Sequence, residues 1–529
     1  MRKTIYVFFV MIIMMAVMAA CSSDGNKDNE EVKDVDVKKE GYPIVDEEIT
    51  MTMMGPGVGK AEWEDMPLLN EYAEKTNISF EYNTPPANDF GTNLNLALSS
   101  GDLEDIIFGP HDLTPGMEAE YGEQGLFLPL EDLIDDYAPN LKKLLEENPD
   151  IEKTITTPDG HIYALPGVSK DHRGQWMSPV WFNGKWLDEL GVEELPETTD
   201  ELYDLLIRFR DEDPNGNGEA DEIPISSVEM EPIRNYFLNA FGLKDQELEE
   251  VDGKVRYAAI TDNYKEYLEY MKKLYDEDLL DTETFSQSDD QKNSKGQENK
   301  IGMFADHYSY FTTGETSEEA MNNPMALPLK SPVSDELIVT AGPGFSRGTF
   351  VLTKENEYPE ASIRWVDHFY SEEGGAEMDQ GPEGYLWEWD ENKEEKLPLD
   401  IPDEYDTSED YRATITPAYG ISPPMLNPPV EVKEQPDDFA IFTKEETEEK
   451  RDPYNEIAIP EVSLTSEERK EVETIEADLE SYVEQMEAKF ITGVEPLSNW
   501  DKYVSTIEDM NIEKYVEIYQ EAYDRWLEN

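Results

Sequence analysis

Apolar and polar residues follow two alternating periods in the amino-terminal part of the chain. The runs ITMTMMG, 49–55, and ISFEYN, 78–83, alternate as half-buried strands do, whereas 63–76 has apolar residues at helical spacing. A second helical stretch, 93–100, ends at Gly101, and a short buried strand, 106–108, follows. This β-α-β-α order predicts a parallel sheet covered by helices, with ligands at the carboxyl ends of its strands.

The carboxyl-terminal part has a helical pattern alone. Thr465 and Glu468 have the spacing of a capping box, and apolar residues then recur every three or four positions until Gly493. A further helical pattern covers 512–527. We therefore expect the chain to end in long helices.

The first residues have the pattern of a bacterial lipoprotein signal peptide, 1–20. Arg2 and Lys3 precede an apolar run, 5–18, that is too short to indicate a membrane span. Small residues lead to Cys21, the only cysteine, which resembles the lipidated residue of a lipobox; the alternative is an ordinary cleaved signal. We expect a lipid on Cys21 to anchor the protein to the outer face of the cell membrane. Residues 21–41 are predicted to form an acidic, flexible tether.

Charge restricts the partners of the protein. Asp and Glu number 121 against 43 Lys and Arg, so the formal net charge is -78. This excess excludes general affinity for nucleic acid, and 28 Tyr, 19 Phe and 9 Trp provide enough apolar surface for a folded core. A folded, external protein of this charge fits a saline, halophilic or an alkaline habitat; the alternative is that the acidity only keeps the protein soluble.

The segment DPNGNGEADE, 213–222, has the spacing of a calcium loop. Gly218, at its sixth position, allows a sharp turn, and the oxygens around it number six, enough for calcium. Pro224 stands where an EF-hand has its bidentate glutamate, so this is not an EF-hand; the alternative is a polar turn without metal. The predicted ligands of a structural Ca²⁺ are Asp213, Asn215, Asn217, Glu219, Asp221 and Glu222.

Several segments together resemble the extracellular solute-binding lipoproteins of family 1, in particular their LplA-like and alginate-oligosaccharide-binding branch. Their order and spacing carry the resemblance over nearly the whole mature chain. Members of this branch hold calcium in the equivalent loop. The segments are 94–108, 159–167, 186–224, 251–281, FITGVEPLSNWDKYV and YQEAYDRWLEN.

The resemblance implies a two-lobed α/β fold of the periplasmic-binding-protein-like type, class II, with a helix-flanked sheet in each lobe and a hinge between them. Residues 42–164 plus 350–378 would form the first lobe, and 165–349 plus 379–529 the second. Such a monomer is no enzyme. It captures a small solute, here an oligosaccharide, by closing its lobes, and delivers it to the permease subunits of an ABC importer.

Aromatic rings that stack on sugar faces are the expected ligand contacts, although core packing is the alternative for each. Trp387 and Trp389 alternate on a strand-like segment, which would put both rings on one face. A uronate would also need cations, for which Arg173, Lys185 and Arg347 are available. The candidate rings are Tyr163, Trp176, Tyr308, Tyr310, Trp387 and Trp389.

Two other functions compete with this one. The segment GFSRG, 344–348, matches the nucleophile elbow of a secreted hydrolase, but the TFVL that follows has a strand pattern where that motif requires a helix. Paired carboxylates for glycoside hydrolysis cannot be recognised among so many acids. A sugar sensor without a transport role is the other alternative.

The charge generates a first prediction. Because salt screens the repulsion among the excess carboxylates, the melting temperature should fall in dilute salt and rise with NaCl concentration. Thermal unfolding across a wide NaCl range measures this, and equal melting temperatures throughout would contradict the saline-habitat interpretation.

Overall fold

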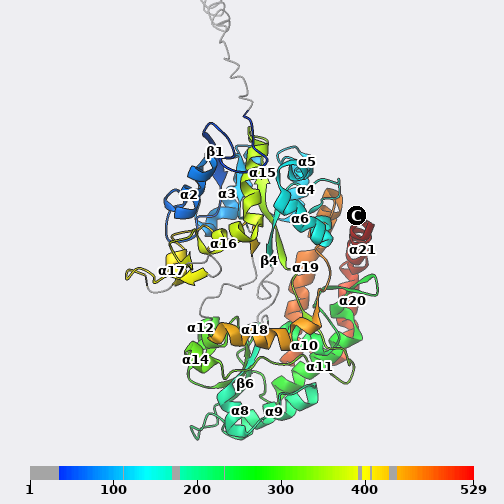
Figure 1. Cartoon of the computed structure of the whole chain (residues 1–529). Helices are drawn as coiled ribbons and strands as arrows, with labels where there is room; N and C mark the ends of the chain where they lie inside the picture. Colours follow the sequence, from blue (N-terminus) through cyan, green and yellow to red (C-terminus); the bar gives the residue numbers. More distant parts are fainter. Residues whose placement is uncertain are drawn as a thin grey trace, which may run out of the picture.

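The computed structural model describes residues 35–110, 112–169, 179–230, 233–390, 396–405, 408–427 and 438–528. These residues form two bodies, one above the other, each with its own sheet and its own apolar core (Figure 1). We call the upper body the first lobe and the lower body the second lobe. The signal peptide, Cys21 and most of the predicted tether lie outside the described residues.

The first lobe contains a six-stranded sheet. β1 and β2 pair in parallel from Ile49 with Ile78 to Met54 with Asn83, which confirms the two strands predicted from alternation. β3 is also parallel to β1, but β11 runs antiparallel between β3 and β4, so the sheet is mixed. Its order is β14-β4-β11-β3-β1-β2, with β1 (Ile49–Met54), β2 (Ile78–Asn83), β3 (Ile106–Phe108), β4 (Leu165–Ser169), β11 (Phe345–Leu352) and β14 (Leu426–Asn427).

Helices cover this sheet and end where the sequence has turn residues. The predicted helical stretch before Gly101 is confirmed, since Gly101 ends it with a φ of 72° in the left-handed region. Trp63, in the short helix η1 (Trp63–Asp65), packs its ring edge-on against Phe108 of the sheet. The helices are α2 (Pro67–Thr76), α3 (Ala87–Ser100), α4 (Pro115–Glu123), α5 (Glu131–Tyr137), α6 (Pro139–Glu147), α7 (Pro149–Ile155), α15 (Pro359–Asp367) and α16 (Glu372–Gln380).

The second lobe is built on a smaller sheet, β5-β9-β6. β6 and β9 are parallel and β5 is antiparallel to β9. Gly302 of β9 lets the rings of Trp186 and Phe209 approach the strand, because a Cβ there would lie 2.6 to 2.8 Å from them. The strands are β5 (Val180–Phe182), β6 (Ile223–Ser226) and β9 (Ile301–Ala305), flanked by α8 (Gly184–Leu190), α9 (Thr199–Asp211), α10 (Arg234–Ala240), α11 (Asp262–Asp276), α12 (Asp289–Gln297), α13 (Ser309–Thr313) and α14 (Ser317–Ala320).

Short pairs of strands and the last helices complete the fold. The capping box of Thr465 and Glu468 is present and starts the long helix α19, as predicted. Buried residues of α19, α20 and α21 belong to the core of the second lobe. These elements are β7 (Leu248–Val251), β8 (Lys254–Tyr257), β10 (Val339–Thr340), β12 (Trp387–Trp389), β13 (Lys396–Pro398), β15 (Asn455–Glu456), α17 (Ser408–Arg412), α18 (Asp438–Lys450), α19 (Ser466–Ile491), α20 (Trp500–Asp509) and α21 (Ile512–Glu528).

The division of the chain between the lobes differs from the predicted one in two places. β4 and the whole of β11 belong to the first sheet, although 165–349 was predicted to be second lobe. The described residues of 379–427 also pack on the first lobe: the Leu68 amide donates to the Ile415 carbonyl (3.2 Å), and the Tyr385 hydroxyl to Glu71 (2.9 Å). Strand pairing and local packing determine these boundaries, and neither can be predicted from the hydrophobic pattern of the sequence.

The fold also removes the nucleophile-elbow interpretation of the GFSRG segment. Ser346 of the GFSRG segment lies in β11, which continues as a strand to Leu352. A nucleophile elbow needs a helix directly after its serine, so this motif match carries no catalytic meaning. Among the described residues, no helix is both long enough and apolar enough to span a bilayer.

A buried ion pair joins three segments of the fold. Arg347 of β11 donates to both carboxylate oxygens of Glu118 on α4 (3.2 and 2.8 Å), and its Nη1 donates to the Ser463 hydroxyl (3.1 Å). The side chains are 4% and 0% exposed. The sequence prediction offered Arg347 as a cation for a uronate, but its guanidinium is already committed to Glu118 inside the protein.

This pair generates a stability prediction. Arg347→Met should lower the free energy of unfolding by about 3–5 kcal/mol, because Glu118 would stay buried without its cation. Urea unfolding measures the change. Lys265→Met, which removes one partner of an exposed pair on α11, is the matched control and should have little effect. Equal, small losses in both variants would contradict the role given to the buried pair.

Candidate functional site

A polar pocket of about 240 Å³ lies at one edge of the first sheet. The carboxyl end of β4, the amino end of β11 and the short strand β14 meet there. This is the edge from which β4 leads toward the second lobe and at which β11 enters from it. The position agrees with the expectation that ligands bind at the carboxyl ends of the strands.

The pocket exists because glycines let a covering segment, 418–427, pass close to the sheet. A Cβ at Gly167 of β4 would lie 2.5 Å from the Pro423 carbonyl oxygen, and one at Gly109 would lie 2.7 Å from Ile421. Any other residue at Gly167 would push this segment away. The covering segment is therefore held as one wall of the pocket.

The pocket is lined by hydroxyls and by one ion pair. Ser346 and Ser422 bring their hydroxyl oxygens within 3.5 Å of each other. Arg412 donates to the Asp379 carbonyl (3.0 Å), with 3.7 Å between its guanidinium and the Asp379 carboxylate. Its guanidinium also lies 5.8 Å from the ring centre of Tyr419, which is 36% exposed. Hydroxyls, a carboxylate, a guanidinium and an exposed ring are the groups that bind sugars.

Sequence reasoning did not find this pocket. Its polar residues come from four separate segments, around β4, β11, α16 and 412–427, and no spacing in the chain connects them. The one available signal was the predicted carboxyl edge of the sheet, which gives the place but not the residues.

The second lobe presents an aromatic cluster. Tyr308 and Tyr310 stack with their ring centres 5.3 Å apart and their planes at 23°. Phe439 of α18 packs against both rings, and Phe311 beside them is 49% exposed. In Figure 1, α18 lies at the edge of the second lobe that faces the first. Tyr308 and Tyr310 are half-buried, so each residue is partly accessible.

The other predicted rings are placed less favourably for stacking. Tyr163 is 4% exposed: its ring fits against Gly122, and its hydroxyl donates to Asp159 (2.8 Å). Burial, and then this hydrogen bond to a carboxylate, raises the pKa of Tyr163. A ring buried to this extent cannot stack on a sugar in this conformation. Trp176, like Arg173, lies outside the described residues.

The two tryptophans of β12 do not form a flat platform. Trp387 is 7% exposed and donates its indole N–H to the Gly381 carbonyl (2.9 Å). The ring of Trp389 meets it at 86°, with centres 5.6 Å apart. The strand was predicted correctly, but one ring lies in a local core and the other packs edge-on against it.

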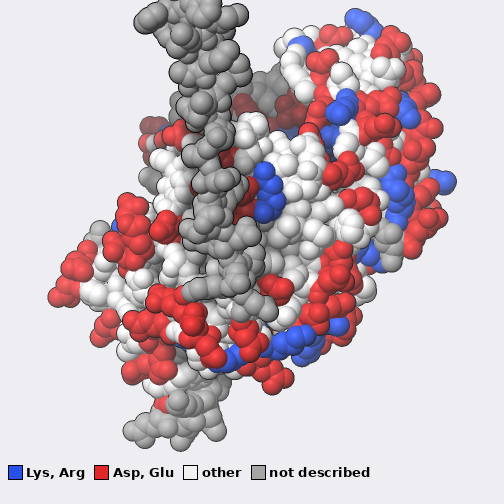
Figure 2. All heavy atoms as spheres, turned by 90° about the horizontal axis from the view of Figure 1, so that it is seen from above, with Lys and Arg blue, Asp and Glu red and all other residues white. Residues whose placement is uncertain are grey.

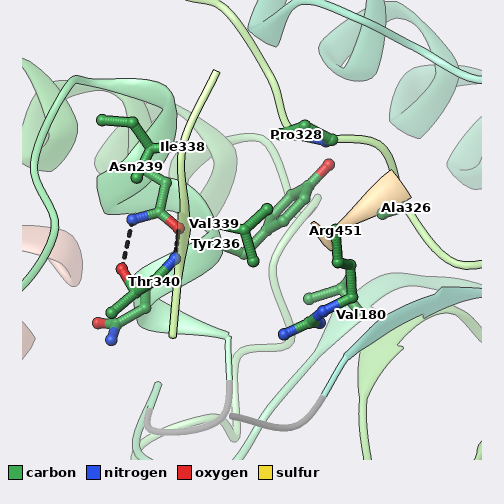
Figure 3. A pocket seen from close by; sticks show the side chains of 10 residues that line it. Val180, Tyr236, Asn239, Ala326, Pro328, Ile338, Val339, Thr340 and Arg451 are labelled. Carbon is green, nitrogen blue, oxygen red and sulfur yellow. Dashed lines mark hydrogen bonds between the residues drawn. The ribbon is translucent and has the colours of Figure 1, made fainter. Parts of the chain in front are cut away.

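A second, much smaller pocket of about 40 Å³ lies inside the second lobe (Figure 3). Asn239 of α10 donates to the Thr340 hydroxyl (2.7 Å) and accepts from the Thr340 amide (3.1 Å), so it fixes β10 directly before the chain enters β11. Burial lowers the pKa of Arg451, at the other side of this pocket, to about 10. The space holds only a few water molecules, so it is too small for a sugar.

The loop 213–222 has a turn that brings its oxygens together. Asp213 has a φ of 49°, and Gly216 and Gly218 are also left-handed. The Asp213 carboxylate accepts from the Gly218 amide (3.1 Å), and Asp221 accepts from the side-chain amides of Asn215 (3.0 Å) and Asn217 (2.8 Å). Within the described residues, no three His, Cys, Asp or Glu side chains are grouped closely enough for a metal, so any ion here needs the Asn and carbonyl oxygens as well.

Glu222 gives the loop an unsatisfied acceptor. Its Oε1 is buried and has no hydrogen-bond partner. Burial raises the pKa of Glu222, and the carboxylates of Asp213 and Asp221 raise it further. Lys300 lies 3.3 Å from the far oxygen of Asp221. A buried acceptor beside two like charges fits a divalent cation, which would relieve both the repulsion and the missing bond.

Charge is distributed unevenly over the surface. Figure 2 shows one face of the first lobe, on which Asp and Glu dominate the periphery and Lys and Arg occur in small groups among them.

Lys185, a predicted ligand cation, lies 2.5 Å from Glu315 and is thus already paired.

Comparison with known proteins identifies the family. The family model for bacterial extracellular solute-binding protein matches residues 60–376. The fructooligosaccharide ABC transporter substrate-binding protein FusA of Streptococcus pneumoniae serotype 4 is 31% identical over 97% of this chain and 97% of its own.

Solved structures agree with this match. FusA of S. pneumoniae in complex with kestose superposes with a TM-score of 0.73 at 28% identity, covering 91% of this chain and 100% of that chain. FusA has also been solved as an EF-hand mutant in complex with fructo-nystose (TM-score 0.72, 28% identity, the same coverage). An HMO-binding solute-binding protein from Bifidobacterium longum infantis, at 22% identity and a TM-score of 0.78 over 90% of this chain and 99% of its own, shares the fold.

These findings confirm the predicted family, the two-lobed α/β fold of the periplasmic-binding-protein-like type, and a binding role in place of catalysis. The chain belongs to the family of bacterial extracellular solute-binding proteins.

Proposed function

We propose that this protein is the receptor of an ABC importer and that it binds a neutral oligosaccharide between its two lobes. The observation that carries the proposal is the polar pocket at the carboxyl edge of the first sheet, together with the aromatic cluster at the facing edge of the second lobe. FusA, whose name gives fructooligosaccharides as its ligands, supports the same ligand class.

The pocket can enclose only part of an oligosaccharide. Its volume of about 240 Å³ is below the range in which a whole ligand of moderate size is enclosed. One end of an oligosaccharide would sit among Ser346, Ser422 and the Asp379–Arg412 pair. The remainder would extend toward the half-buried rings of Tyr308 and Tyr310.

The charges favour a neutral sugar over a uronate. Arg412 is the one cation among the described lining residues, and Asp379 lies beside it. Arg347 is occupied by Glu118 and Lys185 by Glu315. A sugar acid would therefore meet no free positive charge from these residues, whereas hydroxyls would find both donors and acceptors.

Binding of this kind works through closure. A ligand that touches both lobes binds the closed form more tightly than the open form, and it shifts the population by that difference in affinity. No bond in the sugar changes, so the protein can release it intact to the permease subunits.

Cys21 is the proposed attachment point to the outer face of the cell membrane. A lipid there, followed by the acidic tether, would hold the receptor close to its importer. The described chain begins at Val35 and enters the first lobe alone, at the pole opposite the second lobe (Figure 1). A tether attached to one lobe leaves the relative motion of the two lobes free.

The loop 213–222 is the proposed structural calcium site. Asp213, Asn215, Asn217, Asp221 and Glu222 would bind through side-chain oxygens and Glu219 through its carbonyl. The buried, unsatisfied oxygen of Glu222 supports this proposal, as does the EF-hand named in a FusA structure. The ion would tie α9 to β6 and so stiffen the second lobe.

A binding measurement tests the ligand site. Titration calorimetry with a panel of neutral oligosaccharides, kestose included, should give saturable binding, and Asp379→Asn should weaken it about tenfold or more, because a hydrogen bond to a charged acceptor is lost. Asp188→Asn, at an exposed aspartate on α8, is the matched control and should bind as the wild type does. Undiminished affinity in Asp379→Asn would show that the pocket is not the ligand site.

A melting experiment tests the calcium site. Calcium should raise the melting temperature, with ~4 kcal/mol of added stability at a ~1,000-fold excess over its dissociation constant. Asp213→Ala should abolish the rise, and a chelator should reverse it in the wild type. Asp188→Asn again serves as the control that keeps the response. A wild type that melts at the same temperature with calcium and with chelator would refute the site.

A further inference from the structure

The backbone after β6 is strained at two consecutive residues. The described chain has eight non-glycine residues with left-handed backbone, and six of them are Asn or Asp, which adopt this conformation most readily. The other two are Glu229, with a φ of 50°, and Met230, with a φ of 63°. Two larger side chains in succession keep this backbone only where the surroundings enforce it.

Hydrogen bonds from three directions hold this turn. The Glu229 amide donates to the Thr284 carbonyl (2.7 Å), and the Glu229 carbonyl accepts from the Arg234 guanidinium (3.2 Å). The Arg234 amide donates to the Met230 carbonyl (2.8 Å). The Met230 side chain is fully buried in the core of the second lobe. The turn is therefore fixed at both ends.

Arg234 connects the turn to the long helix α19. Its guanidinium donates to both carboxylate oxygens of Glu487 (3.2 and 3.0 Å), whose side chain is 1% exposed. The Tyr267 hydroxyl of α11 donates to the same carboxylate (2.8 Å). Because Arg234 is anchored in this way, the carbonyl of Glu229 cannot move without disturbing a buried ion pair.

The side chain of Glu229 is exposed. Within the described part of the chain, no residue forms a hydrogen bond or ion pair with its carboxylate. A surface residue needs no enforced left-handed backbone to stay in solvent. Backbone strain at a side chain without a described partner indicates that the direction of this side chain is important for function.

The turn lies at the edge of the second lobe that faces the first. It follows the carboxyl end of β6, which is parallel to β9, and β9 leads directly into Tyr308 and Tyr310. It also precedes α10, which Figure 1 places beside α18 near this edge. Glu229 and the aromatic cluster therefore share one edge of the second sheet.

We propose that Glu229 is a specificity-determining residue that accepts hydrogen bonds from sugar hydroxyls and repels ligands with carboxylates. The inference rests on the proposed function, which it deepens by naming a residue that selects neutral over acidic oligosaccharides. An ionised carboxylate can only accept hydrogen bonds, so it discriminates between a hydroxyl donor and a second carboxylate. The strained turn fixes the direction in which this side chain leaves the backbone before the ligand arrives.

Substitutions at Glu229 test the inference against a strain control. Calorimetric titration with kestose and with an oligogalacturonate should show that Glu229→Gln binds the neutral sugar about tenfold more weakly and loses part of its discrimination against the acidic one. Glu229→Gly should lose the same affinity without a fall in melting temperature, since glycine accepts a positive φ. Asp252→Gly relieves a left-handed backbone in the β7–β8 turn and should leave affinity unchanged.

The outcomes separate this inference from the proposed function. A wild type that binds no oligosaccharide of the panel overturns the proposed function, and this inference with it. Wild-type affinity and discrimination in Glu229→Gln overturn the inference alone. A fall in the melting temperature of Glu229→Gln equal to that of Arg234→Met would also overturn it, because Glu229 would then serve only to stabilise the turn.

Discussion

The strand β11 is the constraint on which the rest of the structure depends. It enters the first sheet antiparallel between β3 and β4, so its first residues lie at the carboxyl edge of its neighbours. That direction brings Ser346 to the pocket and turns Arg347 inward to Glu118. Gly167 of β4 and Gly109, directly after β3, then let the covering segment 418–427 approach the sheet. The direction of β11 therefore contributes both to the pocket and to the buried ion pair.

Three arginines of this acidic chain pair with buried carboxylates. Arg347 matches Glu118, Arg234 matches Glu487, and the guanidinium of Arg256 lies 2.7 Å from the fully buried Glu249. Glu247 is a half-buried carboxylate without such a cation among the described residues. Burial raises its pKa to about 7, with a smaller contribution from the carboxylates of Glu480 and Asp245. These carboxylates are therefore of two kinds: those paired with an arginine, and those, such as Glu247, whose pKa is raised by burial.

The sequence predicted the elements more reliably than the site. Alternation and capping residues gave β1, β2, the end of α3 and the start of α19, because each depends on local periodicity or on one cap. The burial of Tyr163 and the ion pair of Arg347 were not predictable in this way, because residue type alone does not show whether an aromatic ring or a cation lies in the core or on the surface. Only the approach of distant segments decides between them, as with Gly122 against Tyr163.

The last helices have a consequence for how a ligand enters. α19 packs on α4 of the first lobe, and the indole of Trp526 on α21 donates to Thr154 (3.1 Å) with Lys153 over its ring. These contacts join the two lobes along one side, so the lobes would separate most widely along the opposite side. A ligand that binds between the lobes would therefore enter from the side opposite α19 and α21.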